Sequence, residues 1–243
     1  MRFLLFLLLA LSLQAGEIRV ALAANVSYAI DELLKEFHKT NKDITVKINI
    51  GGSGSLTSQI RNFAPYDVFM SANMIYPEAL YKEKKALTKP VIYAKGSLAL
   101  LSVKKRDFKD GIYILKDKTI KKIAMANPKT APYGVAAKEA LENAKLYNQI
   151  KNKLVYGQSI AQTVAYAIKA TDIGLIAKSA LYNPKLKHFK KDENWIEVDS
   201  KLYTPISQGI VLLSKNSDAK AFYDFILSDR AKEIFKRYGY IVE

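Results

Sequence analysis

Four short turns rich in small residues constrain the fold of this chain, because each stands between a predicted strand and a predicted helix. They lie at residues 23–26, 51–56, 130–134 and 157–160. Parallel strands cannot be joined by a tight turn and need a crossover, which is usually a helix. A chain that repeats strand, turn and helix is therefore typical of a mainly parallel sheet covered by helices. The order of elements predicts an α/β fold.

The predicted elements fall into two similar units with no flexible linker between them. Apolar alternation predicts strands at residues 18–23, 44–50, 67–70, 97–103, 122–126, 154–156, 173–177 and 207–213. Helical spacing of apolar residues predicts helices over 26–40, from 56 onward, over 133–144 and 160–170, and a closing helix pair over 220–238. We expect one lobe from residues 17–95 plus 206–243 and a second from 96–205, with residues 184–195 forming a surface loop.

The first residues have the features of a secretory signal peptide. Arg2 precedes an apolar run over residues 3–11, which ends near the small residues Ala15 and Gly16. This run is too short to span a bilayer. The chain contains no cysteine, which excludes a lipid anchor on cysteine, disulfides and thiolate metal sites. Residues 1–16 are thus predicted to be a signal peptide, and the protein to be periplasmic.

The formal charge of +15 raises nucleic acid as a possible partner. The lysines, however, are scattered over several segments and are not interleaved with aromatic residues along one stripe. Together with the predicted export, this pattern indicates a solvated lysine-rich surface and no nucleic-acid partner.

The four turns also suggest a function. The start of a helix carries unpaired N–H groups and a partial positive charge, which suit an anion. In open parallel sheets, ligands bind beyond the carboxyl ends of the strands, and all four turns lie at that edge, two in each predicted lobe. A cleft between the lobes would bring them face to face around a small oxyanion.

Several segments, in this order, resemble the molybdate-binding periplasmic proteins of ABC transporters. They are residues 23–26, 52–56, 64–72, 127–134, 221–225 and 233–239. The resemblance extends over nearly the whole chain after the predicted signal peptide. It implies the two-lobed type II periplasmic-binding protein fold with the ligand in the interlobe cleft. It also implies molybdate or tungstate as ligand, no cofactor, and the membrane permease of the transporter as partner.

The resemblance implies particular ligand-binding residues. Two side-chain donors of the first lobe fall on Asn25, where the family usually has serine, and on Ser53. Two backbone donors of the second lobe fall on Tyr133 and Ile160. A tyrosine that completes the site in some members falls on Ala177, which has no hydroxyl to donate. Molybdenum or tungsten would be held only as the oxyanion, and the possible neighbours are Gly54, Ser159 and Ala177.

Three alternatives remain. Sulfate or another oxyanion is the nearest alternative ligand. A ferric-iron carrier of the same fold is disfavoured, because no tyrosine pair lies near a turn and helix starts repel cations. A secreted serine hydrolase using Ser53 is remote, since the final glycine of a nucleophile elbow is absent and His38 and His188 have no context suggesting a base. We therefore predict a binding protein and no enzyme.

Overall fold

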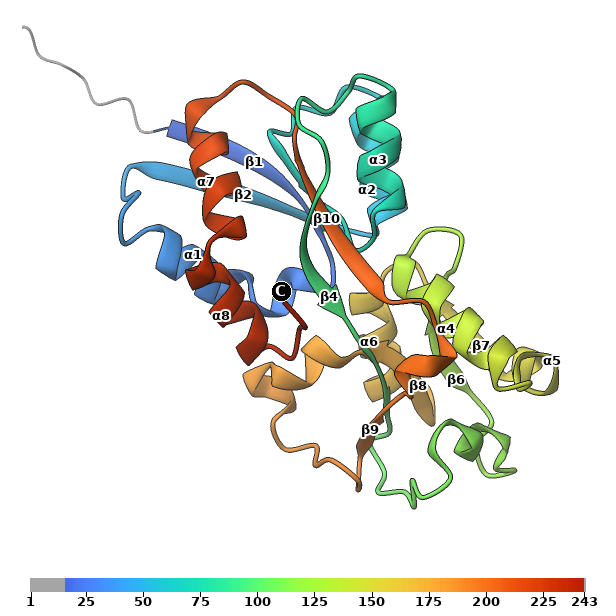
Figure 1. Ribbon diagram of the computed structural model, residues 1–243. Coiled ribbons are helices and arrows are strands. Elements are labelled where there is room, and N and C mark those ends of the chain that lie inside the picture. The colour runs from blue at the N-terminus through green and yellow to red at the C-terminus, as the bar shows by residue number, and fades with distance from the viewer. Residues whose placement is uncertain (1–15, 243) are drawn as a thin grey trace, which may run out of the picture.

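The computed structural model describes residues 16–242, which form two five-stranded sheets that lie one above the other in Figure 1. The predicted signal peptide lies outside these residues, apart from Gly16. Among residues 16–242, no helix is both long enough and apolar enough to cross a bilayer.

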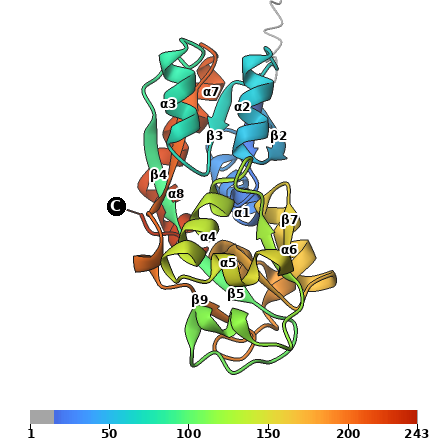
Figure 2. The same cartoon turned by 90° about the vertical axis from the view of Figure 1, so that its right-hand side faces the viewer.

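The first lobe is built on a sheet that gathers strands from both ends of the chain. Its order is β2 (Ile44–Gly51), β1 (Gly16–Ala23), β3 (Val68–Met70), β10 (Ile206–Leu212) and β4 (Val91–Gly96). Strands β1, β2 and β3 are parallel, and β10 runs antiparallel to both of its neighbours. Helices α1 (Ile30–Phe37), α7 (Ser217–Leu227) and α8 (Asp229–Arg237) pack against one face, and α2 (Ser53–Arg61) and α3 (Ile75–Lys82) against the other. Figure 2 shows α2 and α3 on their common side.

The second lobe repeats this plan. Its sheet has the order β7 (Leu154–Gly157), β6 (Ile123–Ala126), β8 (Ile173–Ala177), β5 (Leu98–Leu101) and β9 (Trp195–Glu197). Strands β6, β7 and β8 are parallel, and β5 is antiparallel. Its helices are α4 (Pro132–Asn143), α5 (Tyr147–Ile150) and α6 (Ile160–Lys169). The chain passes between the sheets twice, from β4 to β5 and from β9 to β10, as Figure 1 shows. The predicted α/β fold with two mainly parallel sheets is confirmed.

The structure corrects two predicted elements. The helix predicted over residues 26–40 is a short 3-10 turn, η1 (Val26–Tyr28), followed by α1. The predicted surface loop at residues 184–195 is partly interior, because Leu186 and Phe189 join the hydrophobic cluster beneath it. A 3-10 turn, η5 (Pro184–Leu186), directs Leu186 inward. The many lysines of this segment made it look fully exposed, although Leu186 and Phe189 are buried. The remaining 3-10 turns are η2 (Gly111–Lys116), η3 (Lys151–Lys153), η4 (Lys178–Tyr182) and η6 (Ser200–Leu202).

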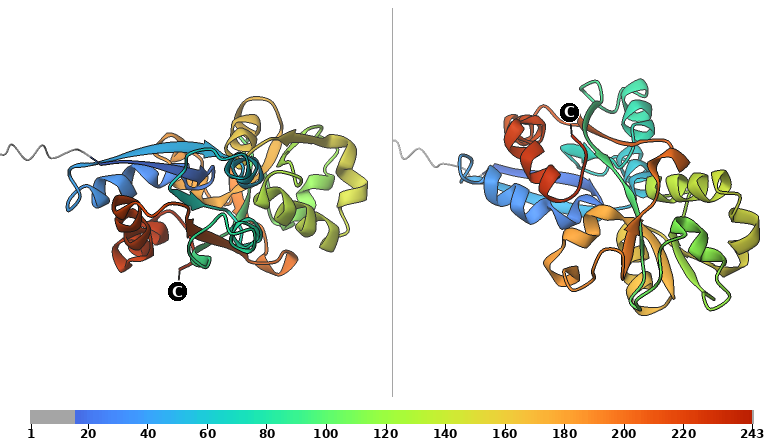
Figure 3. Two further views of the ribbon diagram at one scale, coloured as in Figure 1. Left: turned by 90° about the horizontal axis from the view of Figure 1, so that it is seen from above. Right: turned by 60° about the horizontal axis from the view of Figure 1, so that its bottom comes forward.

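Phe37 anchors the packing of the C-terminal helices onto the start of the chain. Its ring is fully buried and meets Phe222 edge-on, with centroids 5.3 Å apart, and Phe225 at 5.5 Å. Figure 3 shows α7 and α8 beside α1, which is the arrangement that these contacts hold. The last helices therefore complete the core of the first lobe.

Phe37→Ala should lower the free energy of unfolding by about 3–5 kcal/mol, because it removes a buried ring and leaves a cavity. Urea denaturation followed by circular dichroism measures this loss. Val103→Ala, at a side chain that is 46% exposed, serves as the control and should change stability by less than about 0.5 kcal/mol. Equal effects of the two substitutions would contradict this account of the core.

Candidate anion-binding site

A small cavity of about 10 Å³ lies where the two lobes meet. The structure brings all four predicted ligand-binding residues to its wall: Asn25 and Ser53 from the first lobe, and Tyr133 and Ile160 from the second. The other lining residues are Ala23, Ala24, Gly51, Gly52, Ala72, Ala131 and Pro132. Each predicted turn thus contributes to one site, as expected if the strand ends converge.

The wall of this cavity carries no charged side chain. Within residues 16–242, no group of three or more histidine, cysteine, aspartate or glutamate residues is placed to hold a metal ion. Any attraction for an anion must therefore come from hydrogen-bond donors and from the partial charges of helix starts. Such a wall suits an anion and offers nothing to a bare cation.

Ser53 is the first residue of α2 and is 1% exposed. Its Oγ accepts a hydrogen bond from the N–H of Ala72 at 2.9 Å. A hydroxyl has one proton to donate besides its acceptor positions. Because the hydrogen bond from Ala72 uses an acceptor position of Oγ, the hydroxyl proton of Ser53 is available to a ligand in the cavity.

Tyr133 and Ile160 contribute backbone rather than side-chain chemistry. Tyr133 follows Pro132 in the first turn of α4, and Ile160 is the first residue of α6. N–H groups of the first helical turn have no acceptor within their helix. The Tyr133 phenol turns away into the interior, where it accepts a hydrogen bond from Gln208 Nε2 at 3.2 Å. The two N–H groups are therefore the donors that the second lobe offers.

Asn25 is fully buried, and its carboxamide is oriented differently from the prediction. The expected role is donation through the amide to the anion. In the structure Nδ2 donates to Gln208 Oε1 at 2.8 Å and to Tyr240 Oη at 3.0 Å. Oδ1 is buried without any partner. Asn25 precedes η1 but makes no side-chain capping bond.

The three predicted neighbours take other roles and are absent from the cavity wall. Gly54 donates its N–H to the carbonyl of Thr130 in the second lobe at 3.2 Å. Ser159 caps α6, since its Oγ accepts from the N–H of Gln162 at 3.2 Å. Ala177 is fully buried at the end of β8.

Gln208 and Tyr240 were not predicted to belong to the site, although both contact Asn25. They follow it by 183 and 215 residues. One signal was present for Gln208, which together with Ser207 is polar within an otherwise apolar strand, β10. Its side chain is fully buried and satisfied only by other buried side chains.

The lobes touch through short polar contacts around the cavity. Besides the Gly54–Thr130 bond, Ser179 Oγ donates to the carbonyl of Asn25 at 3.2 Å. Gly52 makes a close approach, since a Cβ there would lie 3.0 Å from the carbonyl oxygen of Gln158 and 3.1 Å from that of Thr130. These contacts hold the two lobes together in a closed arrangement.

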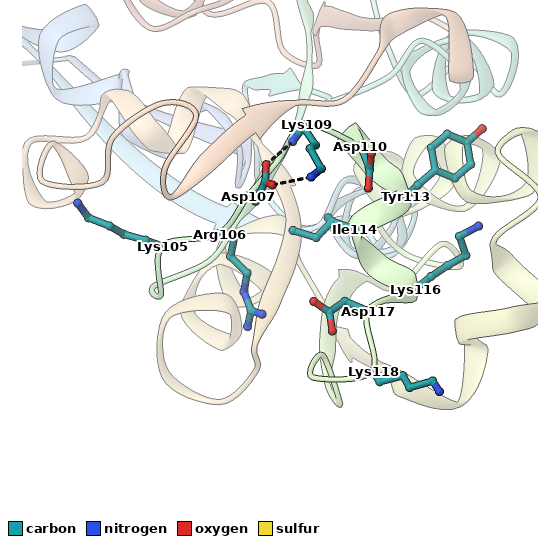
Figure 4. A pocket seen from close by; sticks show the side chains of 10 residues that line it. All are labelled: Lys105, Arg106, Asp107, Lys109, Asp110, Tyr113, Ile114, Lys116, Asp117 and Lys118. Atoms are coloured by element: carbon teal, nitrogen blue, oxygen red, sulfur yellow. Dashed lines mark hydrogen bonds and ion pairs between the residues drawn. The ribbon is translucent and has the colours of Figure 1, made fainter.

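A larger hollow of about 890 Å³ lies elsewhere on the second lobe, and Figure 4 shows its lining of lysines and aspartates. Its charged groups are partly neutralised among themselves: Lys109 Nζ lies 3.2 Å from Asp107 Oδ2. The hydrogen bonds from Lys109 lower the pKa of the Asp107 carboxyl. Strand ends and helix starts do not converge there, so volume alone does not make this hollow the functional site.

The fold and this cleft define a solute-binding protein. The chain belongs to the bacterial extracellular solute-binding protein family, which it matches over residues 18–241. It is 38% identical over 240 residues to the molybdate-binding protein ModA of Azotobacter vinelandii, covering 96% of this chain and 93% of that protein. It is 35% identical to the molybdate-binding protein ModA of Rhodobacter capsulatus, with 97% and 92% covered.

The structural comparison agrees. The periplasmic molybdate-binding protein of Azotobacter vinelandii superposes with a TM-score of 0.86 and 28% identity, covering 93% of this chain and 99% of that one. These relatives are binding proteins of transport systems and not enzymes. The geometry gives the hydrolase alternative no support, because the cavity wall contains neither histidine. His38 Nε2 instead meets the carbonyl of Ile44 at 3.0 Å.

Gly52→Ala should weaken anion binding by about tenfold, because the new methyl group forces the walls apart and disfavours the closed form. Calorimetric titration of molybdate measures the effect. The backbone of Gly52, at φ −69° and ψ 138°, is open to alanine, so the ligand-free variant should melt at the wild-type temperature. Unchanged affinity would show that this close approach does not limit closure.

Proposed function

We propose that this chain is an extracytoplasmic binding protein that captures molybdate and delivers it to an ABC importer. The observation that supports this proposal most strongly is that two helix starts and Ser53 line one cavity without charged side chains. The similarity to molybdate-binding proteins over nearly the full length supports the choice of ligand.

The chemistry of the ligand fits such a wall. Molybdate is a tetrahedral dianion without a proton at neutral pH, so it only accepts hydrogen bonds. The Ser53 hydroxyl and the N–H groups of Tyr133 and Ile160 donate to it, and each bond to a charged group contributes about 1.5–3 kcal/mol. Tungstate has nearly the same size and charge and should bind at the same place.

The same wall discriminates against smaller and protonated anions. Sulfate carries the right charge but is smaller, so helix ends held at a fixed separation would grip it loosely. Hydrogen phosphate brings a proton that needs an acceptor. The unpaired side-chain acceptor on this wall is Asn25 Oδ1, so phosphate is rejected only if Asn25 turns its Nδ2 toward the ligand. Sulfate is the alternative ligand that a binding test must address.

Transport follows from closure of the two lobes. One lobe consists of residues 17–95 and 206–243, and the other of residues 96–205. A ligand that bridges Ser53 and the two second-lobe N–H groups favours the closed form by its difference in affinity for the two states. The membrane permease of the transporter would recognise this form and open it. Export by the signal peptide at residues 1–16 would place the protein in the periplasm.

Isothermal titration of the ligand-free protein with molybdate, tungstate, sulfate and phosphate tests this function. We expect tight one-to-one binding of molybdate and tungstate and no measurable binding of the other two. Binding of sulfate alone would overturn the assignment of the ligand. Phosphate binding within tenfold of molybdate would contradict a wall that only donates.

Ser53→Ala should weaken molybdate binding by at least about tenfold, because it removes a hydrogen bond to a charged ligand. The matched control is Ser55→Ala, which changes the same residue type in the same helical turn at an exposed position. Titration calorimetry on both variants gives the comparison. An unchanged affinity in Ser53→Ala would show that the site lies elsewhere.

A further inference from the structure

Gln208 links the proposed ligand residues of the two lobes. Its Oε1 accepts from Asn25 Nδ2 at 2.8 Å, and its Nε2 donates to Tyr133 Oη at 3.2 Å. Asn25 and Gln208 are fully buried, and Tyr133 is 1% exposed. No water competes for these groups, so the orientation of one side chain constrains the next.

The recorded arrangement does not suit an oxyanion at Asn25. Both of its amide protons have protein acceptors, Gln208 Oε1 and Tyr240 Oη. The one free atom is Oδ1, an acceptor without a donor. A buried, unpaired acceptor is unfavourable, and a dianion that only accepts hydrogen bonds cannot relieve this cost. Asn25 therefore has to turn its carboxamide before it can donate to such a ligand.

Asn25 cannot turn alone. A half turn of its carboxamide would set Oδ1 against Gln208 Oε1, two acceptors with no proton between them. If Gln208 turns as well, its Nε2 donates to Asn25 Oδ1 and its Oε1 accepts from Tyr133 Oη. The two carboxamides therefore reverse together or not at all.

The surrounding tyrosines can follow this reversal. Tyr93 Oη lies 2.8 Å from Gln208 Oε1 and 3.2 Å from the carbonyl oxygen of Ser71. After the reversal it accepts from Gln208 Nε2 and gives its own proton to Ser71. Burial raises the pKa of the Tyr93 and Tyr133 phenols well above the ordinary value, so both keep the proton that this exchange uses.

Tyr240 Oη, which gives its proton to the backbone carbonyl of Asn25 at 2.8 Å, has to turn that proton to Oδ1, and the carbonyl keeps the hydrogen bond from Ser179 Oγ. Every buried group then has a partner except Asn25 Nδ2, which is left for the ligand.

We propose that Gln208 is a positioning residue that sets which atom of Asn25 faces the ligand, by a coupled reversal of the two carboxamides when molybdate binds. This inference rests on the proposed function and specifies how one departure from the family pattern, Asn25 in place of serine, is accommodated. Gln208 itself touches no ligand.

A double-mutant cycle on molybdate affinity tests the proposal with four proteins: wild type, Gln208→Met, Asn25→Ser and the double variant. A serine hydroxyl turns by itself and needs no neighbour to set its polarity. Gln208→Met should therefore weaken binding by about tenfold beside Asn25 and by less than about threefold beside serine. The same loss in both backgrounds, or none in either, would overturn the proposal, because a purely structural role does not depend on the residue at position 25.

Two controls separate the possible failures. Gln149→Met changes an exposed glutamine that does not line the cavity and should leave the affinity for molybdate unchanged. If the wild-type protein fails to bind molybdate, the proposed function is wrong. If wild type binds molybdate but the cycle shows no dependence on position 25, only the role of Gln208 is wrong.

Nuclear magnetic resonance on wild type tests the reversal even where a variant does not fold or bind. With glutamine side chains labelled with nitrogen-15 and molybdate at saturation, the Gln208 amide protons should show their stronger cross-peak to the Tyr93 ring. A stronger cross-peak to the Tyr133 ring would mean that the recorded orientation persists with the ligand bound, which would overturn the proposal.

Discussion

The structure depends on N–H groups at helix starts that have no partner within their helices. Such groups must find an acceptor or face a site where a ligand supplies one. Here Gly54 has found one in the carbonyl of Thr130, which draws the two lobes together. Tyr133 and Ile160, at the starts of α4 and α6, line the cavity beside Ser53. In the proposed function, affinity for an anion arises from the same kind of donor as the contact between the lobes.

The small residues around the cavity let the two backbones approach. Gly52 lies against two carbonyl groups of the opposite lobe, and the alanines on the wall keep bulky side chains out. Gly96 has a related role, because a Cβ there would lie 2.0 Å from Tyr133 Oη and 2.6 Å from Gln208 Nε2. The hydrogen-bonded network behind the cavity needs that space. We propose that selectivity comes from the spacing and direction of the donors rather than from net charge.

Much of this arrangement was open to prediction, because strand–turn–helix order is local in sequence. The apolar patterns of β1, β2, β6 and β7 and the turns after these strands identified the edge where Asn25, Ser53, Tyr133 and Ile160 meet. Helix α3 and strand β4 were missed, because α3 contains Pro77 and β4 directly follows Pro90, and a proline weakens the signal for a regular element. The orientation of the Asn25 carboxamide was beyond local reasoning, because partners from β10 and the chain end set it.

The most direct test is a crystal structure of the protein grown with molybdate, with the anion located by the anomalous scattering of molybdenum. We expect one strong peak between the lobes, with oxygens of the anion about 2.7–3.2 Å from Ser53 Oγ and from the backbone nitrogens of Tyr133 and Ile160. A peak among the lysines of the large hollow at residues 105–118, with none between the lobes, would contradict it. The anion would then be held by surface charge rather than by helix starts.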